Sequence, residues 1–213
     1  MFGLTMRIEM DELGITLRAL SKNDLPQVVN GFTSMKVHRW TTQMYAQTLE
    51  NEEEWYENNR KAQDSCVWGI VPDGSEVPVG VTGLHRIDIH GSCTSGIIIW
   101  DTSWWRKGVA TRAHLARTLY AADYLNRLTI KSMVRCKNPA SLNALKRVGY
   151  SVCGVEPRTF FRDGEWVDSH HLIWLNPQRI SLIYPEGLPK EYEEGVVKAT
   201  ESLEKARQFV QFV

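Results

Sequence analysis

A short basic loop with one glycine, Trp104-Trp105-Arg106-Lys107-Gly108, is the segment of this sequence best suited to hold an anion. It follows a strand pattern over 96–100 and opens a glycine-free helical pattern from Thr111 to about Leu125. The first backbone N–H groups of a helix are unpaired and lie at the positive end of the helix dipole. A glycine at that point lets a phosphate group approach the main chain closely. The spacing differs from that of a Walker A loop, which needs a second glycine and a Gly-Lys-Ser/Thr ending.

A second motif follows the next predicted strand. Asn138-Pro139-Ala140-Ser141 precedes a helical run that ends in Lys146-Arg147-Val148-Gly149-Tyr150. Together the two motifs resemble the GNAT superfamily of acyl-CoA-dependent N-acyltransferases, whose loop reads Gln/Arg-x-x-Gly-x-Gly/Ala and whose later helix begins Asn-x-x-Ser/Ala. Gly108 and Ala110 match the loop, whereas Trp105 replaces the usual Gln or Arg. That replacement is common in the branch similar to ribosomal-protein N-terminal (alanine) acetyltransferases.

The resemblance covers residues 15–175 and implies both a fold and an activity. The implied fold is a mixed α/β domain, in which a twisted mixed sheet of six to seven strands is flanked by helices. The implied activity is that of an N-acetyltransferase, in which a primary amine attacks the thioester of acetyl-CoA directly. The sequence leaves open whether that amine is a protein N-terminus or a small molecule, because the loops that recognise an acceptor vary most within a fold.

The resemblance also indicates which residues hold the cosubstrate. Strand backbone at Ile98, Ile99 and Trp100 is expected to pair with the pantetheine arm, and one main-chain N–H there to serve as an oxyanion donor. The pyrophosphate is expected on the loop and the first helical turn, at Trp105, Arg106, Lys107, Gly108, Val109, Ala110 and Thr111. Asn138 is predicted to bridge the main chain and the pantetheine, to cap the helix that follows it, or to do both.

The catalytic roles are harder to assign. Leu145 replaces the tyrosine with which many family members protonate the leaving thiolate, so Ser141 is the candidate proton donor or thiolate partner. Its alternative role is that of a serine in the first helical turn. Ser95 replaces the glutamate that often acts as base. A histidine suits this role because an imidazole titrates near neutral pH. His85 is the first candidate, because it lies two residues after Gly83 on a strand expected beside the splayed centre of the sheet. Asp168 is another candidate, unless it only braces its hairpin. The remaining candidates are Asp88 and His170, and a water chain would make a base unnecessary.

The periodicity of the sequence supplies the elements that must position these residues. Strands are predicted over 15–20, 67–71, 77–86, 95–100, 129–136, 151–156 and 169–175. Helices are predicted over 21–32, 48–63, 111–125 and 190–213, and another after Asn138. Asp163-Gly164 predicts a hairpin turn. The helical tail defines an extension, residues 177–213, beyond an acyltransferase domain at 1–176. The tail is expected either to pack on that domain or to pair with a second copy as a homodimer.

Composition excludes several function classes. The chain has 213 residues, of which 43% are hydrophobic and 23% charged, as in an ordinary globular domain. Its formal net charge is zero, which disfavours a nucleic-acid partner. Lys and Arg gather between 104 and 150, in the same third as the anion loop. Arg117 and Arg127 are interpreted there as solvated helix positions. The four cysteines are widely spaced, so we expect reduced thiols and no metal site.

Location and specificity are predicted from weaker signals. The mixed, acidic start of the chain lacks the order of a signal peptide, and no apolar run is long enough to span a bilayer. We therefore expect a cytoplasmic protein without a membrane partner. Trp68 and Trp174 are predicted in the core, whereas Arg39 and Trp40 are predicted in the acceptor wall. The alternative to an active enzyme is a catalytically silent CoA-binding sensor or scaffold with the same fold, since the family's glutamate and tyrosine are both replaced.

Overall fold

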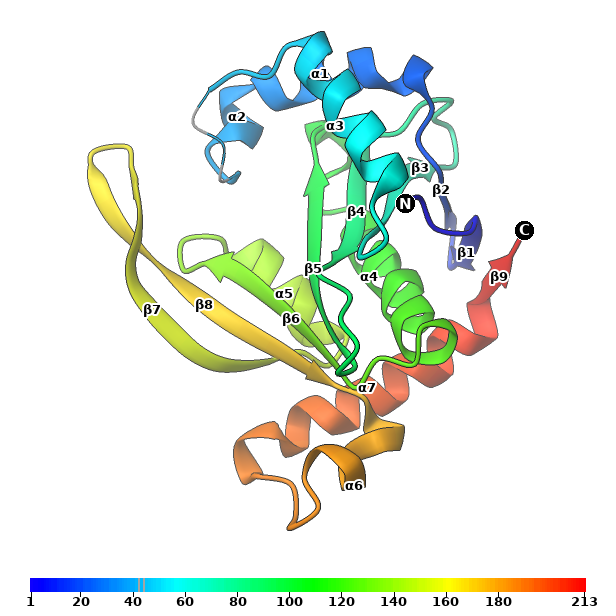
Figure 1. The fold of residues 1–213 in the computed structure, drawn as a ribbon, viewed down its shortest axis with the longest axis vertical. Coiled ribbons are helices and arrows are strands. Elements are labelled where there is room, and N and C mark those ends of the chain that lie inside the picture. The colour runs from blue at the N-terminus through cyan, green and yellow to red at the C-terminus, as the bar shows by residue number, and fades with distance from the viewer. Residues whose placement is uncertain (42, 44) are drawn as a thin grey trace.

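The protein forms one mixed sheet with helices on both faces (Figure 1). The computed structural model describes residues 1–41, 43 and 45–213. Within these residues the sheet has nine strands in the order β7-β8-β6-β5-β4-β3-β2-β1-β9. The strands are β1 (Met6–Met10), β2 (Leu13–Arg18), β3 (Cys66–Pro72), β4 (Gly80–His85), β5 (Ser92–Ile99), β6 (Thr129–Arg135), β7 (Ser151–Arg162), β8 (Glu165–Leu175) and β9 (Val210–Phe212). All neighbours are antiparallel except β5 and β6, which run parallel.

The helices fall into groups that cover different parts of the sheet. They are α1 (Leu25–Thr33), α2 (Met35–His38), α3 (Leu49–Lys61), α4 (Val109–Leu119), α5 (Pro139–Arg147), α6 (Ile180–Ile183) and α7 (Lys190–Phe209). Figure 1 shows α1, α2 and α3 together at one end of the molecule, above the β3–β5 part of the sheet. α4 and α7 pack against each other. None of the helices in the described residues is long and apolar enough to cross a membrane.

The parallel pair β5 and β6 opens the sheet. Its ladder joins only Ser92–Thr94 to Thr129–Lys131, and the two strands then diverge (Figure 1). Strands that separate leave one edge of each backbone without a ladder partner. The opening is therefore the place in the sheet where an extended ligand could pair with main-chain groups.

The core confirms two sequence predictions and corrects a third. Trp68 and Trp174 are fully buried, as predicted. Arg117 is also fully buried, so its interpretation as a solvated helix position is wrong. The physical reason lies in α4, whose neighbouring positions are small and apolar, such as Ala113 and Ala116. This helix therefore packs closely on the sheet and carries the arginine into the core with it.

The C-terminal extension differs from the prediction of a helix that runs to the end of the chain. α7 ends at Phe209, and Val210–Phe212 forms β9, which pairs with Met6–Ile8 of β1. β1 and β9 bring the sheet to nine strands, instead of the six to seven expected. Leu203 of α7 is buried in the main hydrophobic core. The extension thus packs on its own domain, while the homodimer stays a prediction.

Candidate active site

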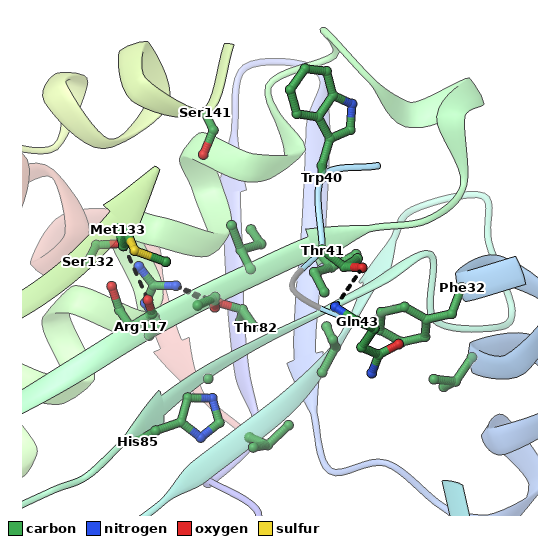
Figure 2. Close-up of a pocket in the computed structure, with 18 of the residues that line it drawn as sticks. Phe32, Trp40, Thr41, Gln43, Thr82, His85, Arg117, Ser132, Met133 and Ser141 are labelled. Atoms are coloured by element: carbon green, nitrogen blue, oxygen red, sulfur yellow. Dashed lines mark hydrogen bonds between the residues drawn. The ribbon is translucent and has the colours of Figure 1, made fainter. Parts of the chain in front are cut away.

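The opening between β5 and β6 leads into a cavity of about 390 Å³. Figure 2 shows the side chains that surround it, with one end formed by β6 and α5 and the other by the segment around α1 and α2. The labelled residues at these two ends are Ser132, Met133 and Ser141 on one side and Phe32, Thr41 and Gln43 on the other. The cavity thus connects the opened sheet to the segment predicted to form the acceptor wall.

Two paired glycines form part of the cavity wall. Gly83 of β4 lies opposite Gly96 of β5, and both line the cavity. A Cβ atom built on Gly96 would meet no described atom within 4 Å, so the space beside this strand is open. A Cβ atom on Gly83 would instead lie 2.7 Å from Nε2 of His85. The absence of side chains here makes room for a ligand on one strand and for an imidazole on the other.

The alternation of β5 decides which of its backbone groups face the opening. The N–H of Trp100 donates to the carbonyl of Val79, 3.0 Å away, on the β4 side. Because successive strand residues point to opposite edges, Ile98 also turns its backbone toward β4, whereas Ile97 and Ile99 turn theirs toward the opening. The backbone of Ile98 and Trp100 is thus engaged on the β4 side and is not free to pair with a pantetheine as predicted. The backbone of Ile99 does face the opening, and its pairing with a pantetheine stays a prediction.

The anion loop has the backbone conformation that the glycine predicted. Gly108 is the N-cap residue of α4 with a φ of +82°, and Arg106 also has a positive φ, +63°. Glycine adopts such angles at little cost, and it leaves the first N–H groups of the helix without a side-chain cap. Trp105 fixes the loop to β5, because its Nε1 donates to the carbonyl of Ile99 at 2.9 Å. Lys107 lies over the ring of Trp104, 4.9 Å from its centroid.

The loop and its first helical turn lie beside the described cavity without lining it. This group comprises Trp105, Arg106, Lys107, Gly108, Val109, Ala110 and Thr111, and none of them belongs to the cavity wall. Val109 is buried, whereas the loop residues before Gly108 are exposed or half-buried. The structure therefore presents two separate features along β5, an uncapped helix start and a cavity that is partly open to solvent.

Arg117 of α4 is a functional candidate that the sequence reasoning missed. Its Nη1 donates to Oγ1 of Thr82 at 2.7 Å and to the carbonyl of Gly96 at 2.9 Å. Its Nη2 is 2.8 Å from Nδ1 of His114. No carboxylate pairs with it in the part of the chain that the structure describes. The available signal was its place between small and apolar residues of the predicted helix, Ala116 before it and Leu119 two positions after it.

His85 is the candidate base that the structure brings into the cavity. Burial lowers the pKa of its imidazole, and the positive charge of Arg117 lowers it further. Both effects favour the neutral form, which is the form that can accept a proton. No hydrogen-bond partner of the ring occurs among the residues that the structure describes, so its nitrogens are available to a ligand.

Asn138 and Ser141 occupy the start of α5. The side-chain oxygen of Asn138 accepts a hydrogen bond from the N–H of Ser141 at 3.1 Å, which is an N-cap. The hydroxyl of Ser141 is left to face the cavity (Figure 2). The structure thus shows the capping role of Asn138, while the role of Ser141 as a thiolate partner stays a prediction.

Asp168 does not join these residues. Its Oδ1 accepts from the N–H of Arg158 at 2.9 Å, across an irregular part of the β7–β8 hairpin where Arg158 has a φ of +53°. Asp168 lies outside the cavity wall. The carboxylate therefore braces the hairpin, as the alternative interpretation of this residue predicted.

The α3 side of the cavity carries a second group that the sequence reasoning missed. Glu52 of α3 lines the cavity and is only 5% exposed. Burial raises the pKa of its carboxyl group, and no cation or hydrogen-bond donor contacts the carboxyl group within the described ranges. Trp55, one helical turn later, lines the same cavity. The spacing of Glu52, Trp55 and the buried Asn59 on one helix face was the available signal.

Contacts across the opening hold the residues that follow α2, Arg39 and Thr41. Arg135 of β6 donates to the carbonyls of Arg39 and Thr41, and Nη2 of Arg39 lies 2.8 Å from Oδ2 of Asp163 at the hairpin tip. Trp40, predicted in this wall, lines the cavity. Arg39 instead faces the hairpin and is absent from the cavity wall.

Comparison with known proteins identifies the family to which this site belongs. Residues 15–151 match the family model described as an acetyltransferase (GNAT) domain, and the chain belongs to this family. It is therefore an N-acetyltransferase, a class of acyltransferase. No curated protein sequence shows significant similarity to the chain. Within the described residues, no group of three or more side chains could hold a metal ion.

Solved structures share the fold. A spermidine N-acetyltransferase from Vibrio cholerae, in complex with CoA and spermine, has a TM-score of 0.69 at 24% identity over 76% of this chain and 95% of its own. A chimera of that enzyme with hSSAT has a TM-score of 0.68 at 23% identity, over 78% of this chain and 98% of its own. A protein described as a probable acetyltransferase has a TM-score of 0.70 at 19% identity, over 80% and 97%.

Proposed function

We propose that this protein transfers the acetyl group of acetyl-CoA to the primary amine of a small molecule that carries a second positive charge. One observation carries the proposal: the cavity at the opened β5–β6 edge continues into a wall that holds the buried carboxyl group of Glu52, which has no partner among the described residues. The same cavity thus contains main-chain groups suited to a thioester and an acid suited to a cation.

The residues of the opening fit a CoA thioester. The uncapped start of α4 at Gly108 would hold the pyrophosphate through backbone N–H groups, and the positive end of the helix favours its charge. The pantetheine arm would extend along the free edge of β5, where the backbone of Ile97 and Ile99 faces the opening. A bound thioester would then have its carbonyl beside these N–H groups, which could stabilise the oxyanion that forms during attack.

The side chains of the cavity support direct attack by the amine. His85 is held neutral and would take the proton that the acceptor nitrogen loses as the C–N bond forms. The electron pair of the broken C–S bond would pass to sulfur, and the hydroxyl of Ser141 would offer that thiolate a hydrogen bond. An active enzyme explains these placements better than a silent CoA-binding scaffold, which would need no neutral base in the acceptor cavity.

Glu52 supports a cationic acceptor. Burial of a carboxyl group without a cationic partner disfavours its charged form, and this is the cause of the raised pKa of Glu52. A second ammonium group on the acceptor would supply the missing partner. The spermine in the similar Vibrio cholerae structure is an amine with several positive charges, and it supports this class of acceptor over a protein N-terminus.

An amine panel tests the proposal. Thiol release from acetyl-CoA would be measured with monoamines, diamines of matched length and peptides with free N-termini. We expect diamines to be preferred, and the variant Glu52→Gln to lose this preference while it retains turnover of monoamines. Glu53→Gln is the matched control, because Glu53 is the next residue and is exposed. Preference for peptides would favour the N-terminal acetyltransferase branch, and CoA binding without turnover of any amine would favour the sensor.

A further inference from the structure

Ser95 lies at the closed end of the β5–β6 opening. It is the first β5 residue beyond the parallel ladder, which ends at the pair Thr94 and Lys131. Its carbonyl accepts a hydrogen bond from the hydroxyl of Ser132 at 3.3 Å, and its side chain lines the cavity. The hydroxyl of Ser95 is therefore placed where the strands part, on the strand whose free edge faces the opening.

A buried phenol stands behind this serine. The hydroxyl of Tyr150 lies 3.2 Å from Oγ of Ser95, and Tyr150 is only 2% exposed. Tyr150 does not line the cavity. Its hydroxyl has no further hydrogen-bond partner among the residues described. The pair thus connects the hydrophobic core to the cavity through a single side-chain hydrogen bond.

The backbone before Tyr150 fixes the position of the phenol. Gly149 has a φ of +97°, and the N–H of Tyr150 donates to the carbonyl of Leu145 at 3.2 Å, which closes the end of α5. A Cβ atom on Gly149 would lie 2.5 Å from the backbone of Ala199 in α7. The turn therefore requires glycine both for its angle and for the approach of α7, and it holds Tyr150 in one orientation.

The direction of the hydrogen bond follows from the available partners. A buried hydroxyl group with only one possible hydrogen-bond partner donates its proton to that partner, so that the donor is not left unpaired. Tyr150 then donates to Oγ of Ser95, which keeps its own proton. That proton has one acceptor in the described structure, the carbonyl of Lys131 at a long 3.4 Å. A stronger acceptor in the cavity, such as an anionic sulfur, would compete for it successfully.

We infer that Ser95 donates a hydrogen bond to the departing CoA thiolate and that Tyr150 orients the Ser95 hydroxyl for this role. The inference rests on the proposed function. The acceptor nitrogen forms a bond to the acetyl carbon, the C–S bond breaks, and its electron pair stays on sulfur. Ser95 stabilises this charge until the thiolate leaves and takes a proton from solvent, while His85 receives the proton lost by nitrogen. Tyr150 is a positioning residue, because it reaches the sulfur only through Ser95.

Three variants test this chain of hydroxyls with acetyl-CoA and the best amine of the panel. Ser95→Ala removes the hydrogen bond to a charged group, and we expect kcat to fall roughly 10- to 100-fold with an unchanged KM for acetyl-CoA. Tyr150→Phe retains the ring and should lower kcat by roughly fivefold. The double variant should be no slower than Ser95→Ala alone, because Tyr150 acts only through the Ser95 hydroxyl, which is already absent in Ser95→Ala.

Controls separate this role from a structural one. Tyr120→Phe removes the hydroxyl of another buried tyrosine, which lies outside the cavity, and it should leave turnover unchanged. Calorimetry with CoA and thermal unfolding would be measured for every variant. An unchanged kcat in Ser95→Ala, or losses that multiply in the double variant, would overturn the inference and leave the proposed function intact. Absence of turnover by the wild-type protein would overturn both.

Discussion

Substitution of Gly108 by alanine should weaken CoA binding in a protein that still folds. Gly108 starts α4 with a φ of +82°, and its missing Cβ would lie 2.4 Å from Nη1 of Arg112. Arg112 cannot move aside freely, because it donates to the carbonyl of Met10 at 2.7 Å and to that of Leu13 at 3.0 Å. A methyl group at this position therefore strains the backbone and pushes on an anchored side chain.

Another glycine, Gly74, allows the backbone strain to be measured by itself. Gly74 has a φ of +84°, and a Cβ atom there would meet nothing within 4 Å. Gly74→Ala should therefore cost only the left-handed backbone penalty, about 1–2 kcal/mol of unfolding free energy. Gly108→Ala should cost that penalty and the weakening of one Arg112 hydrogen bond, together roughly 2–4 kcal/mol.

Of the two variants, only Gly108→Ala should weaken the binding of CoA. Distortion of the helix start removes at least one backbone hydrogen bond to a charged phosphate, which is worth about 1.5–3 kcal/mol, or roughly 10- to 150-fold in the Kd of CoA. Calorimetry with CoA and urea unfolding would be run on both variants. The reasoning would be refuted if folded Gly108→Ala bound CoA with the wild-type Kd, or if Gly74→Ala weakened binding equally.

Three further changes test the neighbouring features. Ser141→Ala should lower kcat roughly 10-fold with little change in the Kd of CoA, and a wild-type rate would leave Ser141 only its place in the helix. The acidic limb of the pH–rate profile should lie below pH 6.5, the ordinary pKa of histidine, because burial and Arg117 both disfavour the charged form of His85; a limb above that value would argue against His85 as base. Leu203→Ala should destabilise the protein by about 2–5 kcal/mol in urea unfolding, since Leu203 is 2% exposed; a loss below about 1 kcal/mol would mean that α7 is not part of the core.

Local sequence patterns predicted the elements that carry the site. The glycine of the anion loop, the Asn138 cap and the Asp163-Gly164 turn each depend on residues that are adjacent in the chain. All three have the expected local structure, since the two turn residues have φ values of +53° and +81°. Such features follow from backbone preferences, which a single sequence records directly.

The remaining features depend on contacts between distant parts of the chain. β9 forms because Val210–Phe212 meets β1, and nothing in its three residues marks a strand without that partner. The sheet edge toward which Ile98 directs its backbone could not be predicted, because it depends on the register between β4 and β5. Glu52 was hidden in an acidic run, Glu52-Glu53-Glu54, of which only the first residue turns inward. Register and packing decide these cases, and neither follows from local preference.

The buried guanidinium of Arg117 connects the fold to the chemistry of the cavity. Its hydrogen bonds to Thr82 and Gly96 connect α4 to β4 and β5, the two strands whose paired glycines line the cavity. Its charge also lowers the pKa of His85, after burial itself. A carboxylate partner would cancel that charge, and none is present within the described residues. Burying a cation without such a partner costs stability, which neutral hydrogen-bond acceptors only partly offset. The protein thus maintains, at some cost in folding free energy, a positive charge that adds to the effect of burial in favouring the neutral form of its candidate base.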